Sequence, residues 1–253
     1  MVELGCGLIA IGRQWGTTPE VPSEAGAITF LQGAYDAGVR FFDTAPSYGL
    51  SEERLGIFLR SLTPEQRRGV RVATKFGEHW DSQERTVYAD HSLDALKRSF
   101  DQSRSRLGEI VILQLHKTTP ALLKSPVIAE AFNYALANGA KQIGVSVSDS
   151  VSAEIALTDD RFSVVQLPYN PASPQFHDAV ASACEHGKEL LINRPLQMGN
   201  ITAATQDSES KQAAVVSAFR FILQEEFDGV ILTGTANLGH LQENMAAFTA
   251  AQQ

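Results

Sequence analysis

Four residues whose side chains exchange protons stand where three predicted strands end. Asp43 and Tyr48 follow one apolar run, Lys75 ends the next run, and His116 follows the third. A carboxyl, a phenol, an amine and an imidazole that share one pocket can hold and transfer protons, and a lysine there can also form a Schiff base with a carbonyl compound. These residue types predict acid–base chemistry or, through Lys75, covalent catalysis.

Each of the four also has an ordinary structural explanation when it is taken alone. Asp43 precedes Thr-Ala-Pro and suits a turn, and Tyr48 precedes a glycine and suits packing. A lysine at a strand end is commonly solvated, and a histidine there is commonly a hydrogen-bonded structural residue. Their joint placement favours a shared site, because four ionisable groups then converge in a part of the fold that is otherwise apolar.

The elements that position these residues follow the pattern of βα units. Short apolar runs without clean alternation are typical of parallel strands with both faces buried, and segments of helical periodicity separate them. The runs begin 22 to 41 residues apart, near Leu4, Val39, Val70, Ile110, Lys141, Ser163, Lys188 and Gly229.

Eight βα units can close on themselves, and the chain length suits one barrel of roughly 250 residues. An open Rossmann sheet is less favoured, because Gly5-x-Gly7 lies inside the first strand and lacks the third glycine of a dinucleotide fingerprint. The sequence therefore predicts an α/β fold, a single-domain (β/α)8 TIM barrel over residues 1–253. Its active site should lie at the carboxyl ends of the strands.

Local signals predict where individual elements begin and end. We expect the first strand to extend over the run LGCGLIAIG, residues 4–12. Ser51, Ser125 and Ser173 are expected to cap helices, and the last two are followed by a proline at the first helical position. Gly139 and Gly187 are expected to end the helices that Ser125 and Ser173 begin.

The composition excludes several classes of partner. The chain has 253 residues with 21 Lys+Arg against 29 Asp+Glu, a formal charge of −8, and 43% hydrophobic residues. Such a chain can bury a sizeable core, and without a basic run it is not expected to bind nucleic acid. No apolar run approaches the roughly 18 residues of a membrane helix, so no membrane association is expected.

The cysteine usage and the N-terminus predict a cytoplasmic protein. Cys6 and Cys184 are the two cysteines, which is too few for a disulfide framework or a cysteine-based zinc site. The first residues carry no basic region followed by an apolar stretch, as a signal peptide would. No cluster of His, Asp and Glu indicates a metal site, so no metal is expected.

The motifs at the strand ends resemble those of the aldo-keto reductase family. The segments are FFDTAPSYG followed by SEERLG, then ATKFG, LQLHK, GVSVSD, VVQLPYNP and GTANLGHLQEN. They occur in order on the predicted strand ends, and the resemblance extends from about Leu4 to Phe248. It implies the family's (β/α)8 barrel, in agreement with the strand count.

The resemblance implies roles for the four ionisable residues in NAD(P)H-dependent reduction of an aldehyde or ketone, or the reverse reaction. Tyr48 would be the proton donor, although a phenol with a pKa near 10 is a weak acid. The ammonium of Lys75 would make it a better acid by favouring the phenolate, and Asp43 would hold Lys75 charged and in place. His116 would hydrogen-bond the carbonyl oxygen and help to carry its developing charge.

The resemblance also implies a dinucleotide site formed by residues after the fifth to eighth strands. Asn237 would cap the last helix, whose N-terminal N–H groups favour a phosphate, and a plain capping role is compatible with this. The implied contacts are Ser146 and Gln166 to the nicotinamide carboxamide, Arg194, Leu196 and Gly199 to the pyrophosphate, and Gly234, Thr235, Asn237, His240, Glu243 and Asn244 to the adenosine end.

Three departures from the family pattern affect the cofactor. Val147 follows Ser146 where many members have Asn, and Asn193-Arg194 stands where a tyrosine commonly stacks on the nicotinamide. The segment from Thr233 to Asn244 contains no Lys or Arg, although a 2′-phosphate usually binds one. The family favours NADP(H), and this segment leaves NAD(H) or dual use as an alternative.

The substrate is expected to be a small carbonyl or alcohol compound in an open pocket. Trp15 and Trp80 could line that pocket or pack against its rim, and Arg13 could meet an acidic group or be solvated. We expect a monomer or weak oligomer. Two other functions stay open, namely an aldolase or isomerase barrel that uses Lys75 as a Schiff-base nucleophile, and a non-catalytic nucleotide-binding barrel.

Overall fold

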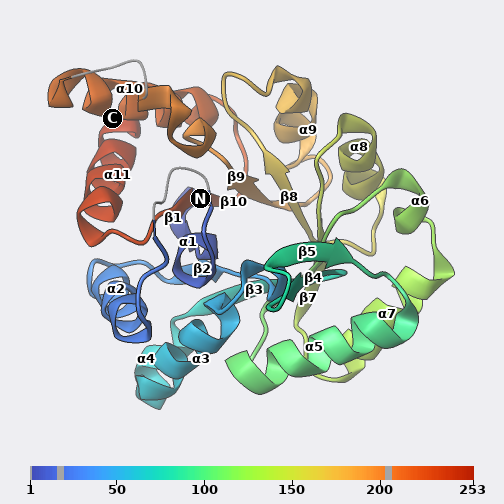
Figure 1. The fold of residues 1–253 in the computed structure, drawn as a ribbon. Coiled ribbons are helices and arrows are strands. Elements are labelled where there is room, and N and C mark those ends of the chain that lie inside the picture. The colour runs from blue at the N-terminus through green and yellow to red at the C-terminus, as the bar shows by residue number, and fades with distance from the viewer. Residues whose placement is uncertain (1, 16–19, 203–206) are drawn as a thin grey trace.

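The computed structural model describes residues 2–15, 20–202 and 207–253, and its centre is a closed parallel barrel (Figure 1). The barrel order is β1-β10-β9-β8-β7-β6-β3-β2, and β1 closes the ring by pairing in parallel with β2. The barrel strands are β1 (Val2–Gly7), β2 (Phe41–Asp43), β3 (Arg71–Phe76), β6 (Ile112–Leu115), β7 (Gln142–Ser146), β8 (Val164–Pro168), β9 (Glu189–Asn193) and β10 (Gly229–Gly234). The (β/α)8 barrel predicted from the sequence is confirmed.

Helices surround the strands, as Figure 1 shows. Those between β1 and β6 are α1 (Ile9–Gly12), α2 (Glu24–Asp36), α3 (Ser51–Ser61), α4 (Pro64–Arg68) and α5 (Leu93–Leu107). Those after β6 are α6 (Pro120–Leu123), α7 (Pro126–Ala137), α8 (Ser150–Thr158), α9 (His177–Ser182), α10 (Ser208–Leu223) and α11 (Leu238–Ala251). Short 3-10 segments are η1 (Pro46–Tyr48), η2 (Pro174–Phe176) and η3 (Gln197–Thr202). Within the described residues, no helix is both long and apolar enough to cross a bilayer.

The inside of the barrel has an apolar layer with a polar layer beyond it. Side chains that alternate along a strand point to the same face every second residue. The apolar layer consists of Phe41, Ala73, Ile112, Val164, Leu191, Val230 and Leu232. Four of these are followed two residues later by a buried polar side chain, giving Asp43, Lys75, Gln114 and Gln166. The packed apolar layer thus forms the floor on which a polar cluster stands.

The first strand is shorter than the sequence predicted. It ends at Gly7, and residues 9–12 form the helical turn α1 rather than continuing the strand. This turn packs against η1 so closely that a Cβ on Gly12 would lie 1.9 Å from the carbonyl oxygen of Tyr48. The prediction of a strand over LGCGLIAIG was wrong after Gly7, because tertiary contact with η1 overrides the apolar pattern.

The prediction that three serine side chains cap helices was wrong. Ser51 is the first residue of α3 rather than its cap, and its hydroxyl donates to the carbonyl of Leu8 and bonds the Thr44 hydroxyl. Ser125 precedes α7 and Ser173 precedes η2, but neither side chain makes a capping bond. The glycines after them adopt the predicted left-handed conformation, with φ of 108° at Gly139 and 63° at Gly187.

An antiparallel hairpin follows β3 and was not predicted. It consists of β4 (Glu78–Asp81) and β5 (Thr86–Ala89), paired from Glu78↔Ala89 to Asp81↔Thr86. Gly77 (φ 98°) makes the turn into β4, and a Cβ there would lie 2.6 Å from the His91 ring. The hairpin contacts η1 through β4, so it adds a wall beside Tyr48.

Candidate active site

A buried ion pair lies at the centre of the polar layer. The Nζ of Lys75 in β3 donates to Oδ1 and Oδ2 of Asp43 at 2.8 and 2.7 Å and to the carbonyl of Thr44 at 2.9 Å. Lys75 is fully buried and Asp43 is 3% exposed. Burial alone would lower the pKa of Lys75, but the charge of Asp43 and its hydrogen bonds raise it above its usual value. Lys75 is therefore a fixed cation.

Tyr48 lies above this pair on η1, the short 3-10 helix that follows β2. Lys75 Nζ is 4.9 Å from the centre of the Tyr48 ring. Burial raises the pKa of Tyr48, while the neighbouring charge of Lys75 acts in the opposite direction. The phenol therefore stays protonated at neutral pH, and Lys75 stabilises the phenolate that forms when the proton leaves.

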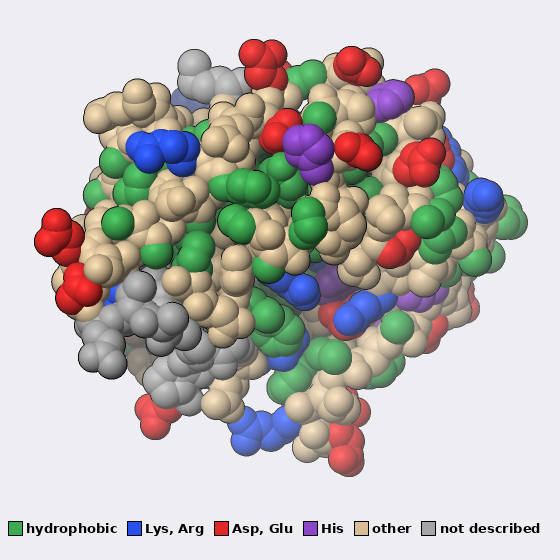
Figure 2. Space-filling view, turned by 90° about the horizontal axis from the view of Figure 1, so that it is seen from above, with side chains coloured by type: hydrophobic (Ala, Val, Ile, Leu, Met, Phe, Trp, Pro, Cys, Tyr) green, Lys and Arg blue, Asp and Glu red, His purple; other side chains and the backbone are tan. Residues whose placement is uncertain are grey.

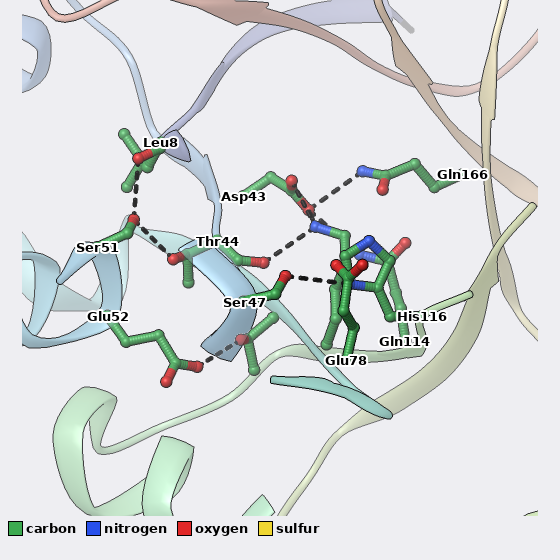
Figure 3. Close-up of polar contacts among 12 residues, drawn as sticks. Leu8, Asp43, Thr44, Ser47, Ser51, Glu52, Glu78, Gln114, His116 and Gln166 are labelled. Carbon is green, nitrogen blue, oxygen red and sulfur yellow. Dashed lines mark hydrogen bonds and ion pairs between the residues drawn. The ribbon is translucent and has the colours of Figure 1, made fainter. Parts of the chain in front are cut away.

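His116 follows β6 and faces both Tyr48 and the hairpin. Its ring centre is 6.2 Å from that of Tyr48, at an interplanar angle of 81°. Its Nδ1 lies 3.1 Å from Oε2 of Glu78 and 3.4 Å from the Ser47 hydroxyl (Figure 3). A carboxylate can only accept a hydrogen bond, so Nδ1 carries the hydrogen in a neutral ring and Nε2 has the lone pair.

Charges around His116 determine its protonation. Burial, followed by the charges of Lys75, Lys117 and Arg13, lowers its pKa well below the usual value. The negative charge of Glu78 would raise the pKa of His116, but Oε1 of Glu78 lies 3.3 Å from Lys117 Nζ, and the charge of Lys117 compensates that of Glu78. The net direction is downward, and the free ring is neutral at pH 7.

Two glutamines and an outer group of polar residues hold the ion pair in place (Figure 3). Gln114 of β6 and Gln166 of β8 each donate through Nε2 to Asp43 Oδ1, at 3.2 and 3.1 Å. Farther out, the Thr74 hydroxyl donates to Oε1 of buried Glu52 at 2.7 Å. Gln166 comes from β8, so the site joins β2, β3, β6 and β8.

Sequence analysis missed Gln114 and Glu78. Gln114 was detectable, because it is an isolated polar residue in an apolar strand, two positions after Ile112 of the barrel floor. Glu78 had no such signal, since its position depends on the hairpin. Gln166 was predicted to bind the carboxamide, and in the structure its Nε2 donates to Asp43 Oδ1.

A long cavity of about 2240 Å³ begins at these residues and extends across the barrel mouth. Asp43, Tyr48 and His116 line one end of it. It is also lined by Ser146, Gln166, Arg194, Leu196, Gly199, Gly234, Thr235, Asn237, His240, Glu243 and Asn244. Every residue predicted for the dinucleotide therefore lines this one cavity.

The middle of this cavity is bounded by an irregular segment after β9. Arg194, Gln197 and Met198 have φ of 53°, 51° and 58°, and Gly199 has φ of 92°. Left-handed non-glycine residues are uncommon and cluster at ligand-binding segments. Backbone N–H groups in such turns can converge on an anion, which suits the predicted position of the pyrophosphate.

Polar atoms along the cavity fit a dinucleotide. The Oδ1 of Asn193, at the end of β9, is buried without a hydrogen-bond partner among the described residues, and Asn193 lines the cavity. A carboxamide N–H₂ could satisfy this acceptor. At the far end, Asn237 caps α11 by accepting from the backbone N–H of His240 at 3.1 Å. The residues present thus suit both ends of the cofactor.

Other residues place charge at the adenosine end of the cavity. Lys211 and Arg220 of α10 line it beside His240, and so do the carboxyl-bearing Glu209 and Glu243. The absence of Lys and Arg between Thr233 and Asn244 therefore does not leave the cavity without cations. Sequence analysis missed these two, because α10 meets α11 only in the folded barrel.

Trp15 and Trp80 both lie against Arg13. The Arg13 guanidinium carbon is 5.0 Å from the Trp15 ring centre and 5.5 Å from that of Trp80. Trp15 lines the long cavity, and both tryptophans line a second cavity of about 890 Å³ beside it. Trp80 lies in strand β4 and is half-buried.

Comparison with known proteins agrees with this geometry. The model of the aldo/keto reductase family matches residues 3–216. L-galactose dehydrogenase of Arabidopsis thaliana is 25% identical in an alignment that covers 97% of this chain and 84% of that protein. Pyridoxal 4-dehydrogenase of Microbacterium luteolum is 32% identical, but the alignment covers 46% of this chain and 40% of that protein.

Solved structures share the fold over almost the whole chain. A Pseudomonas aeruginosa structure assigned to the aldo-keto reductases has a TM-score of 0.81 and 25% identity, covering 99% of this chain and 91% of that one. The glycerol dehydrogenase of Gluconobacter oxydans has a TM-score of 0.74 at 21% identity, covering 99% and 90%, and supports the fold.

Proposed function

Because the chain belongs to the aldo/keto reductase family, whose members are NAD(P)-dependent oxidoreductases, we propose that it reduces small aldehydes or ketones, or oxidises the alcohols, with Tyr48 as proton donor. One observation carries this proposal. A phenol stands beside a buried, fully paired lysine in a cavity of about 2240 Å³ whose lining includes every residue expected to bind the dinucleotide. Relatives named as dehydrogenases of pyridoxal and L-galactose support the oxidative direction, and the family name supports the reductive one.

The protein's residues act on the proton and on the carbonyl oxygen. A bound nicotinamide supplies or accepts the hydride. As the carbonyl oxygen gains negative charge, Tyr48 delivers its proton, and the charge of Lys75 stabilises the phenolate left behind. Asp43 acts through Lys75 and keeps its ammonium charged and oriented. The apolar floor beneath the pair excludes water and strengthens these interactions.

His116 has a role that depends on its protonation. With the hydrogen on Nδ1 beside Glu78, the neutral ring offers Nε2 as an acceptor for the hydroxyl of an alcohol. Because the pKa of His116 is lowered, donation to a carbonyl oxygen at neutral pH requires the other neutral tautomer, with the hydrogen on Nε2 and the Ser47 hydroxyl donating to Nδ1. Glu78 is a positioning residue for His116, because it lies 3.1 Å from Nδ1 and fixes the ring beside Tyr48.

The Schiff-base alternative conflicts with the environment of Lys75. A nucleophilic amine must be uncharged and reach the substrate. Lys75 is fully buried, gives hydrogen bonds to three oxygens, and has a pKa above its usual value. A non-catalytic nucleotide-binding barrel is less favoured, because it leaves the Asp43–Lys75 pair beside Tyr48 without a use.

For the cofactor, we propose NADP(H) in preference to NAD(H). The family uses NAD(P)H, and Lys211 and Arg220 line the end of the cavity where a 2′-phosphate would bind. Charge-assisted bonds from such cations are roughly twice as strong as neutral ones. Titration of both nucleotides should show at least a tenfold preference for NADPH, about 1.4 kcal/mol. The double change Lys211→Met and Arg220→Met should weaken NADPH binding while leaving NADH binding unchanged.

Tyr48→Phe tests the catalytic assignment. The variant lacks the transferable proton but keeps the ring, so carbonyl reduction should be lost while NADPH still quenches protein fluorescence as in the wild type. Tyr88→Phe, an exposed tyrosine on β5, is the matched control and should keep full turnover. Near-native turnover of Tyr48→Phe would refute the role of Tyr48. The expected cytoplasmic location and the monomeric or weakly oligomeric state stay predictions.

A further inference from the structure

The second cavity carries positive charge immediately beside the catalytic residues. Its lining includes Arg13, Arg54 and Arg85, and no carboxylate is among the described residues that line it. This is unusual in a chain of formal charge −8. It also shares Arg13 and Trp15 with the long cavity, so the two spaces meet at Arg13. Figure 2 shows Lys and Arg side chains, with histidine and acidic atoms among them, around a hollow below the centre of one face.

Arg13 is held rigidly next to Tyr48. Its Nε donates to the carbonyl oxygen of Ser47, the residue before Tyr48, at 2.8 Å. The guanidinium contacts the rings of both Trp15 and Trp80, and cation–π contacts of this kind orient an arginine. Within the part of the chain that the structure describes, the one hydrogen bond of the guanidinium is from Nε to Ser47. A guanidinium oriented in this way next to a catalytic phenol suits a bidentate anion.

The acidic groups nearby are already engaged. Glu78 interacts with Arg13 electrostatically, but its two oxygens contact His116 and Lys117. Asp43 is paired with Lys75. Among these groups, two carboxylates face three cations, namely Lys75, Lys117 and Arg13, while the exposed Glu20 also lines the long cavity.

The other two arginines extend this charge away from the catalytic residues. Arg54 of α3 is 7% exposed and donates to the carbonyl of Ile11, and the charges of Glu24 and Glu53 act on it from α2 and α3. Arg85 lies in the turn of the β4–β5 hairpin and is exposed. An anion drawn to the cavity by Arg54 and Arg85 would meet Arg13 at its inner end.

We propose that the natural substrate is a small carbonyl compound with a carboxylate or phosphate group a few bonds from the carbonyl, and that Arg13 binds this anion. The proposal rests on the reductase activity proposed above and names the substrate class of the same site. The anion binds the guanidinium that the two tryptophans orient, while the carbonyl oxygen lies at Tyr48. Arg54 and Arg85 attract the substrate, and Arg13 fixes its orientation.

Matched substrate pairs test the preference in the wild-type protein. The carboxylate pair is 4-oxobutanoate with butanal, and the phosphate pair is glyceraldehyde 3-phosphate with glyceraldehyde. We expect kcat/KM to be at least about 10-fold higher for the charged member of one pair, and the pair that shows it identifies the anion. The preference should shrink as NaCl is raised to 1 M, where the screening length falls to about 3 Å.

Variants assign the preference to residues. Arg13→Met should bring the charged-to-neutral ratio close to one. The ratio is an internal reference, so it stays informative even if loss of the bond to Ser47 slows both substrates. Arg85→Gln touches nothing near Tyr48 and should lower the ratio by a smaller factor. Arg68→Met, an exposed arginine of α4 outside both cavities, is the matched control and should leave the ratio unchanged.

The outcomes separate this inference from the proposed function. Equal kcat/KM for both members of both pairs, with the neutral aldehydes reduced, would overturn the anion site and leave the reductase in place. A preference that Arg13→Met and Arg85→Gln both retain would also overturn it. Failure to turn over any of the four compounds with either dinucleotide would count against the reductase itself.

Discussion

Replacing Lys75 with methionine removes the charge beside Tyr48 and keeps most of the side-chain volume. Nζ lies 4.9 Å from the Tyr48 ring centre, and two unit charges at that separation interact by about 3 kcal/mol at an effective dielectric constant of about 20. Each ~1.4 kcal/mol changes a rate tenfold. If Tyr48 becomes a phenolate in the transition state, kcat should fall by about 100-fold.

The same change leaves Asp43 buried without its cation. Breaking a buried ion pair by removing one partner costs about 3–5 kcal/mol, a large part of the ~5–15 kcal/mol that keeps a typical domain folded. Adding Asp43→Asn removes the unpaired charge. The double variant should therefore recover most of the unfolding free energy of Lys75→Met but none of its turnover.

Two measurements distinguish these effects. Turnover is followed by the absorbance of the reduced nicotinamide, and the free energy of unfolding by urea titration. Lys141→Met is the matched control, since Lys141 is exposed and 3.7 Å from Glu109, a kind of pair worth about 0–1 kcal/mol. A folded Lys75→Met variant with kcat within a few-fold of the wild type would refute the action of Lys75 on Tyr48.

Three further predictions concern Tyr48 and its neighbours. Burial holds the pKa of Tyr48 above its usual value of 10.0. The rate of reduction should therefore stay constant through neutral pH, and the rate of alcohol oxidation, which needs the phenolate, should still rise above pH 10. An oxidation rate that reaches its plateau below pH 10 would contradict this. Glu78→Gln removes the charge 3.1 Å from His116 Nδ1, and kcat for reduction should fall about 10-fold or more, because hydrogen bonds to charged groups contribute about 1.5–3 kcal/mol. The control Glu109→Gln, at an exposed residue, should leave kcat unchanged. A Glu78→Gln enzyme with unaltered kcat would exclude Glu78 from the site. Gly12→Ala places a Cβ 1.9 Å from the Tyr48 carbonyl oxygen, so it should lower the unfolding free energy by about 1–3 kcal/mol through overpacking and also lower kcat. Gly69→Ala is the control, because the nearest atom to its Cβ would be 3.7 Å away, and it should change neither quantity. Equal effects of the two substitutions would show that η1 tolerates displacement.

The barrel was predictable from the sequence because its signals are local. Each strand is a continuous apolar run between turn residues, and parallel strands buried on both faces read this way. Asp43, Tyr48, Lys75 and His116 were found by the same means, since each follows directly from a strand end. Gln114 was within reach of the same argument, as its position two residues after Ile112 fixes the face it occupies.

The rest of the site depends on contacts between distant segments. The β4–β5 hairpin has strongly polar strands, such as Glu78–Asp81, so no apolar run marks it, and with it Glu78 was missed. Glu52, in the first turn of α3, is buried and bonded to Thr74 and Arg106, and nothing in its local sequence indicates these contacts. Lys211 and Arg220 reach the adenosine end of the cavity from α10, where sequence distance gives no indication of proximity.

The position of the ion pair also explains why it is tolerated inside the barrel. Burying two charges is costly, and apolar side chains of similar volume often serve stability as well or better. Here Asp43 accepts from Lys75, Gln114 and Gln166, so its oxygens are satisfied from three other strands. This network spans the barrel at the level where the apolar layer ends and the cavity begins. Stability alone would be served by extending the apolar floor by one more layer, so the polar layer is best explained by what it does to Tyr48.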